Sequence, residues 1–239
     1  MNTNLRKYQN IHSGERVFII GNGPSLRDTN LDLIKNEYSF AMNRISLIYS
    51  KTEWRPSFYV FCSVSINDKD QGDNWKANIR EVIQEEHTLS FIWDCFRNRI
   101  GSVNNYVEWF NTMSENGVGS GRTFYSDIVK SIDKFGTTMN VALQIASYMG
   151  FKKIFIVGAD LGWEVIQCES DDDPNHFDPS YKVNITNGAW EAAQMRKVHL
   201  DTYEAMKKLG IQVYNASHKT LLDVYPLVDY ETIVKDPNW

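Results

Sequence analysis

The chain has 239 residues, of which 42% are hydrophobic and 23% charged, and it carries a formal net charge of -5. This length predicts one domain over residues 1–239 with a substantial core. The acidic balance excludes a general nucleic-acid binder, whose basic surface is missing. The three cysteines, Cys62, Cys95 and Cys168, do not form a CxxC pair. They therefore predict neither a disulfide framework nor a zinc site, and they favour a reducing compartment.

The sequence shows no targeting segment. Residues 1–10 are polar and do not form a signal peptide, and no apolar run approaches the roughly 20 residues of a membrane span. We therefore expect a cytoplasmic protein without a transmembrane segment, for which peripheral contact with a membrane stays open.

The first predicted strand runs directly into a glycine-containing turn. Residues 17–20 are a short β-branched and aromatic run typical of a buried strand, and Gly21, Asn22 and Gly23 follow at once. Two glycines permit positive φ and close approach by another backbone or a ligand. Nucleotides bind at this position in doubly wound α/β folds. The turn matches neither the G-x-G-x-x-G fingerprint nor a Walker loop, so it predicts a nucleotide-binding α/β protein of a less common kind.

The next hundred residues alternate between predicted strands and helices. We expect a short helix over 30–35, strands over 39–42, 57–62 and 89–93, and a helix over 75–86. Residues 97–125 are rich in Asn, Gly and Ser and have weak periodicity, which predicts a long, partly irregular insertion.

A second strongly patterned unit covers residues 137–160. Apolar residues fall on one helical face up to Gly150, which ends the helix, and residues 154–157 predict a buried parallel strand that ends at Asp160. Helix, glycine and strand in this order complete a βαβ unit.

The last third contains a polar excursion, a long helix and a final strand. Residues 164–187 are acidic and predict a lid, residues 195–209 have helical spacing, and residues 211–215 predict a strand. Asn22, Asn43 and Asp160 each follow a strand, and the carboxyl ends of parallel strands share one edge, where ligands bind. The fold class that we expect is α/β, with a Rossmann-like, mostly parallel sheet flanked by helices.

Three motifs resemble a known superfamily. Gly-Asn-Gly-Pro-Ser-Leu at 21–26, Phe-x-x-Asn at 40–43 and the helix-Gly-Phe-Lys-Lys-Ile-strand-Gly-x-Asp unit at 150–160 are similar to two related groups. One is the bacterial sialyltransferase family that uses CMP-sialic acid. The other is the motility-accessory-factor and 6-hydroxymethylpterin-diphosphokinase-like family, whose polysaccharide-biosynthesis members the segment 173–181 resembles.

The resemblance implies roles for particular residues. In the sialyltransferases two asparagines bind the cytidine phosphate, which points to Asn22 and Asn43, and a hydroxyl at the start of the helix before Gly150 points to Thr138. A histidine in the late excursion acts as general base while tyrosines hold the phosphate. These roles fall to His176 and Tyr181.

The nucleotide-binding candidates also have structural explanations. The Asn22 amide, with the turn amides of Gly21 and Gly23, can hold a phosphate oxygen or can only stabilise an Asx turn. Asn43 contacts the ligand or caps a loop. Ser25 belongs to the same turn, and we expect its hydroxyl to cap the next helix, since no Gly-x-Ser-x-Gly elbow makes it a nucleophile.

The catalytic candidates have alternatives of the same kind. His176 suits the deprotonation of an acceptor hydroxyl, with Asp173 or Asp178 orienting its ring, or it is a loop histidine bonded to Asp178. Tyr181 donates to a leaving phosphate or packs the lid. Asp160 serves a ligand or metal or caps the following turn.

The resemblance and these residues predict a sialyltransferase-like glycosyltransferase. It would move a sugar from a nucleotide-activated donor, first of all a CMP-sugar, to a carbohydrate acceptor in bacterial surface-glycan biosynthesis. No cofactor is required, because hydroxyl and amide donors can stabilise a single phosphate. The resemblance also implies a homo-oligomer.

Two other functions stay open. One is a Mg²⁺-dependent pyrophosphoryl transferase of the pterin diphosphokinase type, with the ion on Asp160 and the acidic residues 171–173, which otherwise form a solvated loop. The other is a non-catalytic nucleotide- or glycan-binding module.

Overall fold

The computed structural model describes residues 3–69, 71–112, 124–134, 136–162, 173–183, 187–237 and 239. Within them the chain forms a seven-stranded sheet with the order β5-β4-β3-β2-β1-β6-β7, and all its strand pairs are parallel. The strands are β1 (Arg16–Ile20), β2 (Ser39–Met42), β3 (Phe58–Phe61), β4 (Leu89–Trp93), β5 (Val107–Phe110), β6 (Lys153–Val157) and β7 (Gln212–Asn215). The predicted α/β class with a parallel sheet is confirmed.

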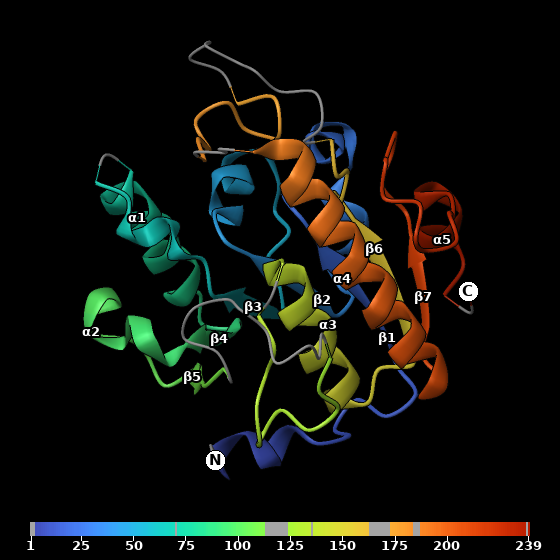
Figure 1. Cartoon of the computed structure of the whole chain (residues 1–239), viewed down its shortest axis with the longest axis horizontal. Coiled ribbons are helices and arrows are strands. Elements are labelled where there is room, and N and C mark those ends of the chain that lie inside the picture. Colours follow the sequence, from blue (N-terminus) through green and yellow to red (C-terminus); the bar gives the residue numbers. More distant parts are fainter. Residues whose placement is uncertain are drawn as a thin grey trace.

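Helices pack along this sheet (Figure 1). They are α1 (Gly72–Ile83), α2 (Arg97–Ile100), α3 (Thr138–Met149), α4 (Gly188–Lys208) and α5 (Tyr230–Lys235). Figure 1 shows α3 and α4 side by side in front of the sheet, and α3 contacts β1, β2 and β3. Among these helices, none combines the length and the apolar composition that crossing a membrane requires.

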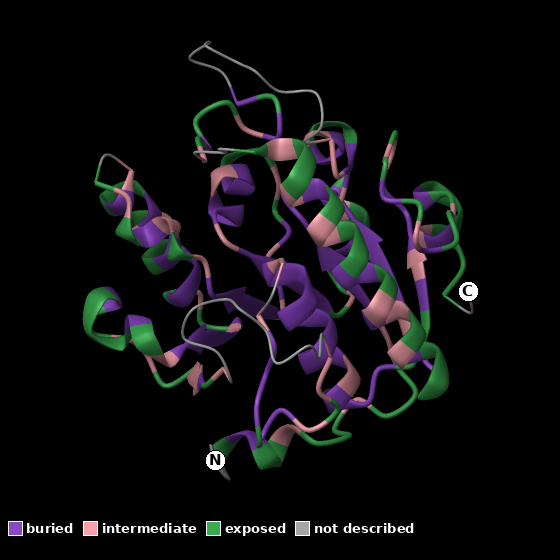
Figure 2. Cartoon of the chain, in the orientation of Figure 1, coloured by how far each residue is buried: buried purple, intermediate pink, exposed green. Residues whose placement is uncertain are grey.

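The core lies at the centre of the sheet and under α3. Val17 to Ile20 of β1 are fully buried, in register with Ile154 to Val157 of β6. α3 is apolar nearly all round because it is covered by the sheet on one side and by α4 on the other, and Figure 2 shows it almost wholly buried. This core fixes the positions of the strand ends at which the polar residues lie.

The strand order reverses between β1 and β6. The chain adds strands in one direction from β1 to β5, then crosses to the other side of β1 to form β6 and β7. In open α/β sheets, ligands bind in the crevice outside the carboxyl ends of strands at such a switch point. A ligand site is therefore expected between the segments that follow β1 and β6.

Several sequence expectations need correction. The insertion expected over 97–125 contains the short helix α2 and the edge strand β5, and its residues 113–123 lie outside the described part. The helix expected over 30–35 is a 3-10 turn, Leu31–Ile34, and α1 begins three residues before its expected start at 75. Of the expected lid, only residues 173–183 and 187 are described, and Asp173, Asn175, His176, Phe177 and Tyr181 within it are buried. The described part forms a wall of the cavity described next, and the lid stays a prediction.

Candidate functional site

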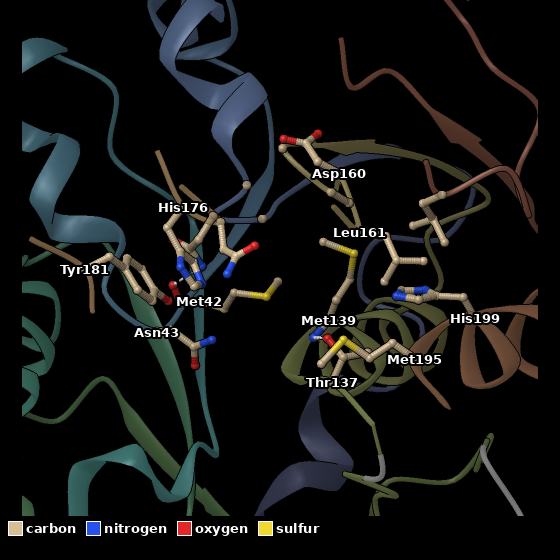
Figure 3. Close-up of a pocket in the computed structure, with 17 residues that line it drawn as sticks. Met42, Asn43, Thr137, Met139, Asp160, Leu161, His176, Tyr181, Met195 and His199 are labelled. Carbon is tan, nitrogen blue, oxygen red and sulfur yellow. Dashed lines mark hydrogen bonds between the residues drawn. The ribbon is translucent and has the colours of Figure 1, made fainter. Parts of the chain in front are cut away.

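A cavity of about 120 Å³ opens at the carboxyl ends of β1, β2 and β6 (Figure 3). The predicted residues that line it are Gly21, Asn22, Gly23, Asn43, Asp160, His176 and Tyr181. Figure 3 shows His176, Tyr181 and Asn43 together on one side, with Leu161 and His199 across from them. Thr138 lines a wider adjoining cavity, and Ser25 lines neither of the two.

The two glycines of the first turn are needed for its close approach to the residues that follow β6. A Cβ on Gly21 would lie 2.3 Å from the carbonyl oxygen of Gly158, and one on Gly23 would lie 2.6 Å from Oδ2 of Asp160. The Gly21 amide donates to Val157 and the Gly23 amide to Gly158, at 2.7 and 2.8 Å. These amides are therefore already used within the chain and do not form the phosphate-binding nest that the sequence predicts.

Asp160 pairs with Ser25 of the first turn. Oδ2 of Asp160 accepts from the Ser25 amide at 2.6 Å, and Oδ1 accepts from the Ser25 hydroxyl at 2.5 Å. The expectation that Ser25 caps the helix is wrong, because Gly23 occupies the cap of the 3-10 helix Pro24–Asp28. Burial raises the pKa of Asp160 even though both hydrogen bonds from Ser25 oppose the rise. The pair ties the turn after β1 to the end of β6.

Two buried amide oxygens that line the cavity have no hydrogen-bond partner among the described residues. They are Oδ1 of Asn22, which is 8% exposed, and Oδ1 of Asn175, which is 6% exposed. Nδ2 of Asn22 donates to the Met42 carbonyl at 3.1 Å, so the amide orientation leaves an acceptor. A buried acceptor without a partner costs about 1–3 kcal/mol. Both oxygens therefore favour a ligand that supplies hydrogen-bond donors.

Asn43 connects strand β2 to helix α3 and to Tyr181. Its φ of 55° is left-handed, a conformation that Asn tolerates better than most residues. Oδ1 of Asn43 accepts from the Thr138 hydroxyl at 3.3 Å, and its side chain also hydrogen-bonds Tyr181. Burial raises the pKa of Tyr181 well above its ordinary value, so this hydroxyl stays protonated and can donate.

His176 forms a buried pair with Asp173. Nδ1 of His176 lies 2.8 Å from Oδ2 of Asp173, and the imidazole stacks on the Tyr181 ring at a centroid distance of 3.8 Å. Burial would raise the pKa of Asp173, but the hydrogen bond and charge of His176 outweigh it and lower this pKa. Asp178, the other expected partner, accepts from Ser180 instead. The imidazole is thus fixed by a carboxylate on its edge and a ring on its face.

Two arginines hold the backbone that carries this pair. Nε of Arg27 donates to the Phe177 carbonyl at 3.0 Å, and Nη2 donates to that of His176 at 2.8 Å. Arg44 is only 4% exposed, and its Nη1 donates to the Ser180 carbonyl at 2.8 Å and also to that of Tyr181. Because the guanidinium groups come from the loops after β1 and β2, the sheet itself positions His176.

The adjoining cavity measures about 430 Å³ and meets the first at Asn43, Thr137, His176, Tyr181 and Met195. The N-terminus of α3 faces this junction, with Thr137 as the cap that accepts from the Met139 amide. Lys134 also lines this cavity, and burial lowers the pKa of its ammonium group. A helix N-terminus beside a cation favours an anion at this junction.

Asn175 and His199 are among the lining residues that were not predicted as site residues. His199 lies four residues after Met195 in α4, on the face that the apolar spacing turns inward, so the sequence did hold a signal. Its Nδ1 lies 2.8 Å from the Tyr225 hydroxyl, and burial lowers its pKa to about 4. His199 is therefore neutral near pH 7 and packs one wall.

The described residues contain no group of three or more His, Cys, Asp and Glu side chains that could hold a metal ion. Asp171 and Asp172, which belong to the expected acidic metal site, lie outside the described part.

Comparison with known proteins gives a family and a fold. The family described as "6-hydroxymethylpterin diphosphokinase MptE-like" matches residues 1–165. The MAf glycosyltransferase of Magnetospirillum magneticum AMB-1 superposes with a TM-score of 0.62 at 15% identity, over 94% of this chain and 35% of that one. This chain thus spans about a third of that protein's length. The sialyltransferase CstII of Campylobacter jejuni, in complex with cytidine-5'-monophosphate, gives a TM-score of 0.49 at 14% identity over 90% and 85% of the two chains. Comparison with curated protein sequences gave no significant match.

Proposed function

This chain belongs to the 6-hydroxymethylpterin diphosphokinase MptE-like family, and from that premise we propose that it is a glycosyltransferase. The proposed donor is a nucleotide-activated sugar, first of all a CMP-sugar, and the proposed acceptor is a carbohydrate hydroxyl in surface-glycan assembly. The observation that carries the proposal is the buried pair of Asp173 and His176, whose side chains lie 2.8 Å apart and whose imidazole lines both cavities.

In the proposed reaction, His176 is the general base. With Nδ1 held by Asp173, Nε2 takes the proton of the acceptor hydroxyl. The acceptor oxygen forms a bond to the anomeric carbon, and the bond from that carbon to the phosphate oxygen breaks. The nucleoside monophosphate leaves with the bonding electrons. The Asp173 carboxylate stabilises the imidazolium that forms, as a carboxylate does in other His–Asp pairs.

The leaving phosphate would lie at the N-terminus of α3. The Tyr181 hydroxyl and the Lys134 ammonium group can donate there, and the Thr138 hydroxyl can do so if it gives up its hydrogen bond to Oδ1 of Asn43. The helix terminus adds a favourable field. The nucleoside would occupy the inner cavity, where the oxygens of Asn22 and Asn175 accept from its hydroxyl or amino groups. This arrangement supports transfer from a monophosphate donor without a required metal ion.

The family itself favours a second function, Mg²⁺-dependent pyrophosphoryl transfer from ATP. That reaction needs more neutralisation of charge, with Asp160 as one expected metal ligand. Both oxygens of Asp160 accept from Ser25, so these hydrogen bonds would have to break before the carboxylate could bind the ion.

A thermal-shift screen with CMP, CDP, UDP, GDP and ATP, each with and without Mg²⁺, separates these functions. A ligand at 100 times its Kd stabilises the folded chain by about 2.7 kcal/mol, which is roughly 5–10 °C for a chain of this size. We expect a metal-independent shift with CMP, retained in His176→Ala. CMP-sialic acid and CMP-Kdo would then be tested as donors, and His176→Ala should abolish their turnover. A shift with ATP and Mg²⁺ alone would overturn the glycosyltransferase and favour the diphosphokinase. CMP binding without turnover of either donor by the native chain would favour a binding module.

A further inference from the structure

In the function proposed above, the cavity of about 430 Å³ beside His176 holds the leaving phosphate where it meets the inner cavity, and the rest of it has no assigned role. It is lined on one side by the segment after β3 and on the other by the first turns of α4. His176 and Tyr181 line this cavity as well as the inner one. A molecule bound in the wider cavity would therefore present its nearest groups to the proposed base.

Two large apolar side chains of this cavity are exposed. Trp190 in the first turn of α4 is 59% exposed, and Val64 after β3 is 60% exposed. The Trp190 amide donates to Oδ1 of Asn187, the cap of α4, so the backbone below the indole is fixed. An indole lining a cavity while keeping more than half its surface in solvent is a ready contact for a ligand.

The polar side chains next to the indole are of types that form hydrogen bonds with hydroxyl groups. Gln194 lies four residues after Trp190, on the same face of α4, and Glu191 lines the cavity beside them. A carboxylate and an amide accept hydrogen bonds from hydroxyl groups, and the amide also donates one. The negative charge of Glu191 disfavours the phosphate of a nucleotide at the same position.

We propose that this cavity binds a pyranose ring of the carbohydrate acceptor. The apolar face of the ring stacks on Trp190, while its hydroxyls bond to Glu191 and Gln194, and one further hydroxyl points toward His176. This acceptor site rests on the proposed function, because it assigns the second substrate of the same reaction.

Saturation-transfer NMR tests the site without any assay of turnover. The probes are the methyl β-glycosides of galactose, glucose and N-acetylglucosamine, each added to the CMP-saturated chain. We expect saturation transfer from the protein to at least one glycoside in the native chain and in Trp190→Phe. This signal should be lost in Trp190→Ala. Tyr106→Ala removes another exposed aromatic ring, one that does not line the cavity, and it should keep the native signal.

Calorimetric titration of CMP into the same variants separates this site from the nucleotide site. We expect the Kd for CMP to stay within twofold of native in Trp190→Ala. A large loss of CMP affinity in that variant would mean that Trp190 stacks on the base, and it would overturn the acceptor site. Saturation transfer to none of the glycosides, or equal transfer in Trp190→Ala, would also overturn it. If the native chain binds no CMP at all, the proposed function fails first, and the glycosides are then tested on the chain alone.

Discussion

The carboxylate of Asp173 lies 2.8 Å from Nδ1 of His176; both side chains are buried, and His176 lines two adjoining cavities. Asp178 is two residues after His176 and its carboxylate accepts from Ser180. This difference between two nearby carboxylates gives a matched pair of variants.

The first prediction concerns the Asp173 and Asp178 variants, together with a variant of His176 itself. Asp173→Asn removes the charge that stabilises the imidazolium, and His176→Ala removes the base. We expect each to lower the turnover of a CMP-sugar by about 10²–10⁴ while the Kd for CMP stays within a few-fold. Asp178→Asn keeps a side-chain oxygen for the Ser180 amide and hydroxyl and leaves the His176–Asp173 pair intact, so it should keep turnover within about threefold of native. Steady-state kinetics and calorimetry on purified variants check this, and equal losses in the two Asp variants would contradict the assignment.

The second prediction concerns the buried oxygen of Asn175. If this oxygen accepts from the nucleoside, Asn175→Asp keeps an acceptor and should leave the Kd for CMP within about threefold of native. Asn175→Leu removes the acceptor and should weaken CMP binding by about 5–150-fold, which corresponds to about 1–3 kcal/mol. If the amide instead donated to the phosphate, the Asp variant would bind worse than the Leu variant, because two negative charges would meet. Calorimetric titration decides between these outcomes.

The third prediction concerns the contact between Gly21 and Gly158. A Cβ on Gly21 would lie 2.3 Å from a carbonyl oxygen of the backbone, so the turn or the end of β6 must move. We expect Gly21→Ala to lower the free energy of unfolding by about 1–3 kcal/mol and to weaken CMP binding. Gly162→Ala is the control, because a Cβ there meets no atom of the described residues within 4 Å. Urea unfolding measures both, and equal stabilities of the two variants would contradict the close approach.

The fourth prediction is a dependence of stability on pH. Burial lowers the pKa of His199 to about 4, whereas an unfolded histidine titrates near 6.5. Between these values the folded chain binds fewer protons than the unfolded chain. The contribution of His199 is therefore fully present above about pH 6.5 and is lost as the pH falls toward 4, for a total of about 3 kcal/mol.

His199→Gln should remove most of that change while an amide still faces the Tyr225 hydroxyl. Urea unfolding at pH 7.5, 6 and 5 should show a shallower loss of stability for this variant than for the native chain. The exposed His87 provides the control, and His87→Gln should follow the native pH curve. Parallel curves for native and His199→Gln would show that His199 is not a buried neutral group.

The sequence by itself determined the strands of the sheet and the polar residues at their ends. Buried parallel strands are short continuous runs of β-branched and aromatic residues, and a run such as residues 17–20 carries that pattern locally. Because parallel strands end at one edge, the common location of Asn22, Asn43 and Asp160 followed from strand order in the chain. β5 was missed because an edge strand is only partly buried and lacks the continuous apolar run.

Only the tertiary structure decided which partner each of these residues has. The hydrogen bonds between Ser25 and Asp160 span 135 residues, and they exist because β6 returns beside β1 after four other strands have been added. The same crossing places Gly158 against Gly21 and so uses the turn amides that a local pattern leaves available to a phosphate. A sequence pattern specifies which groups can form hydrogen bonds. The pairing and register of strands that are distant in the sequence determine which of these groups come into contact.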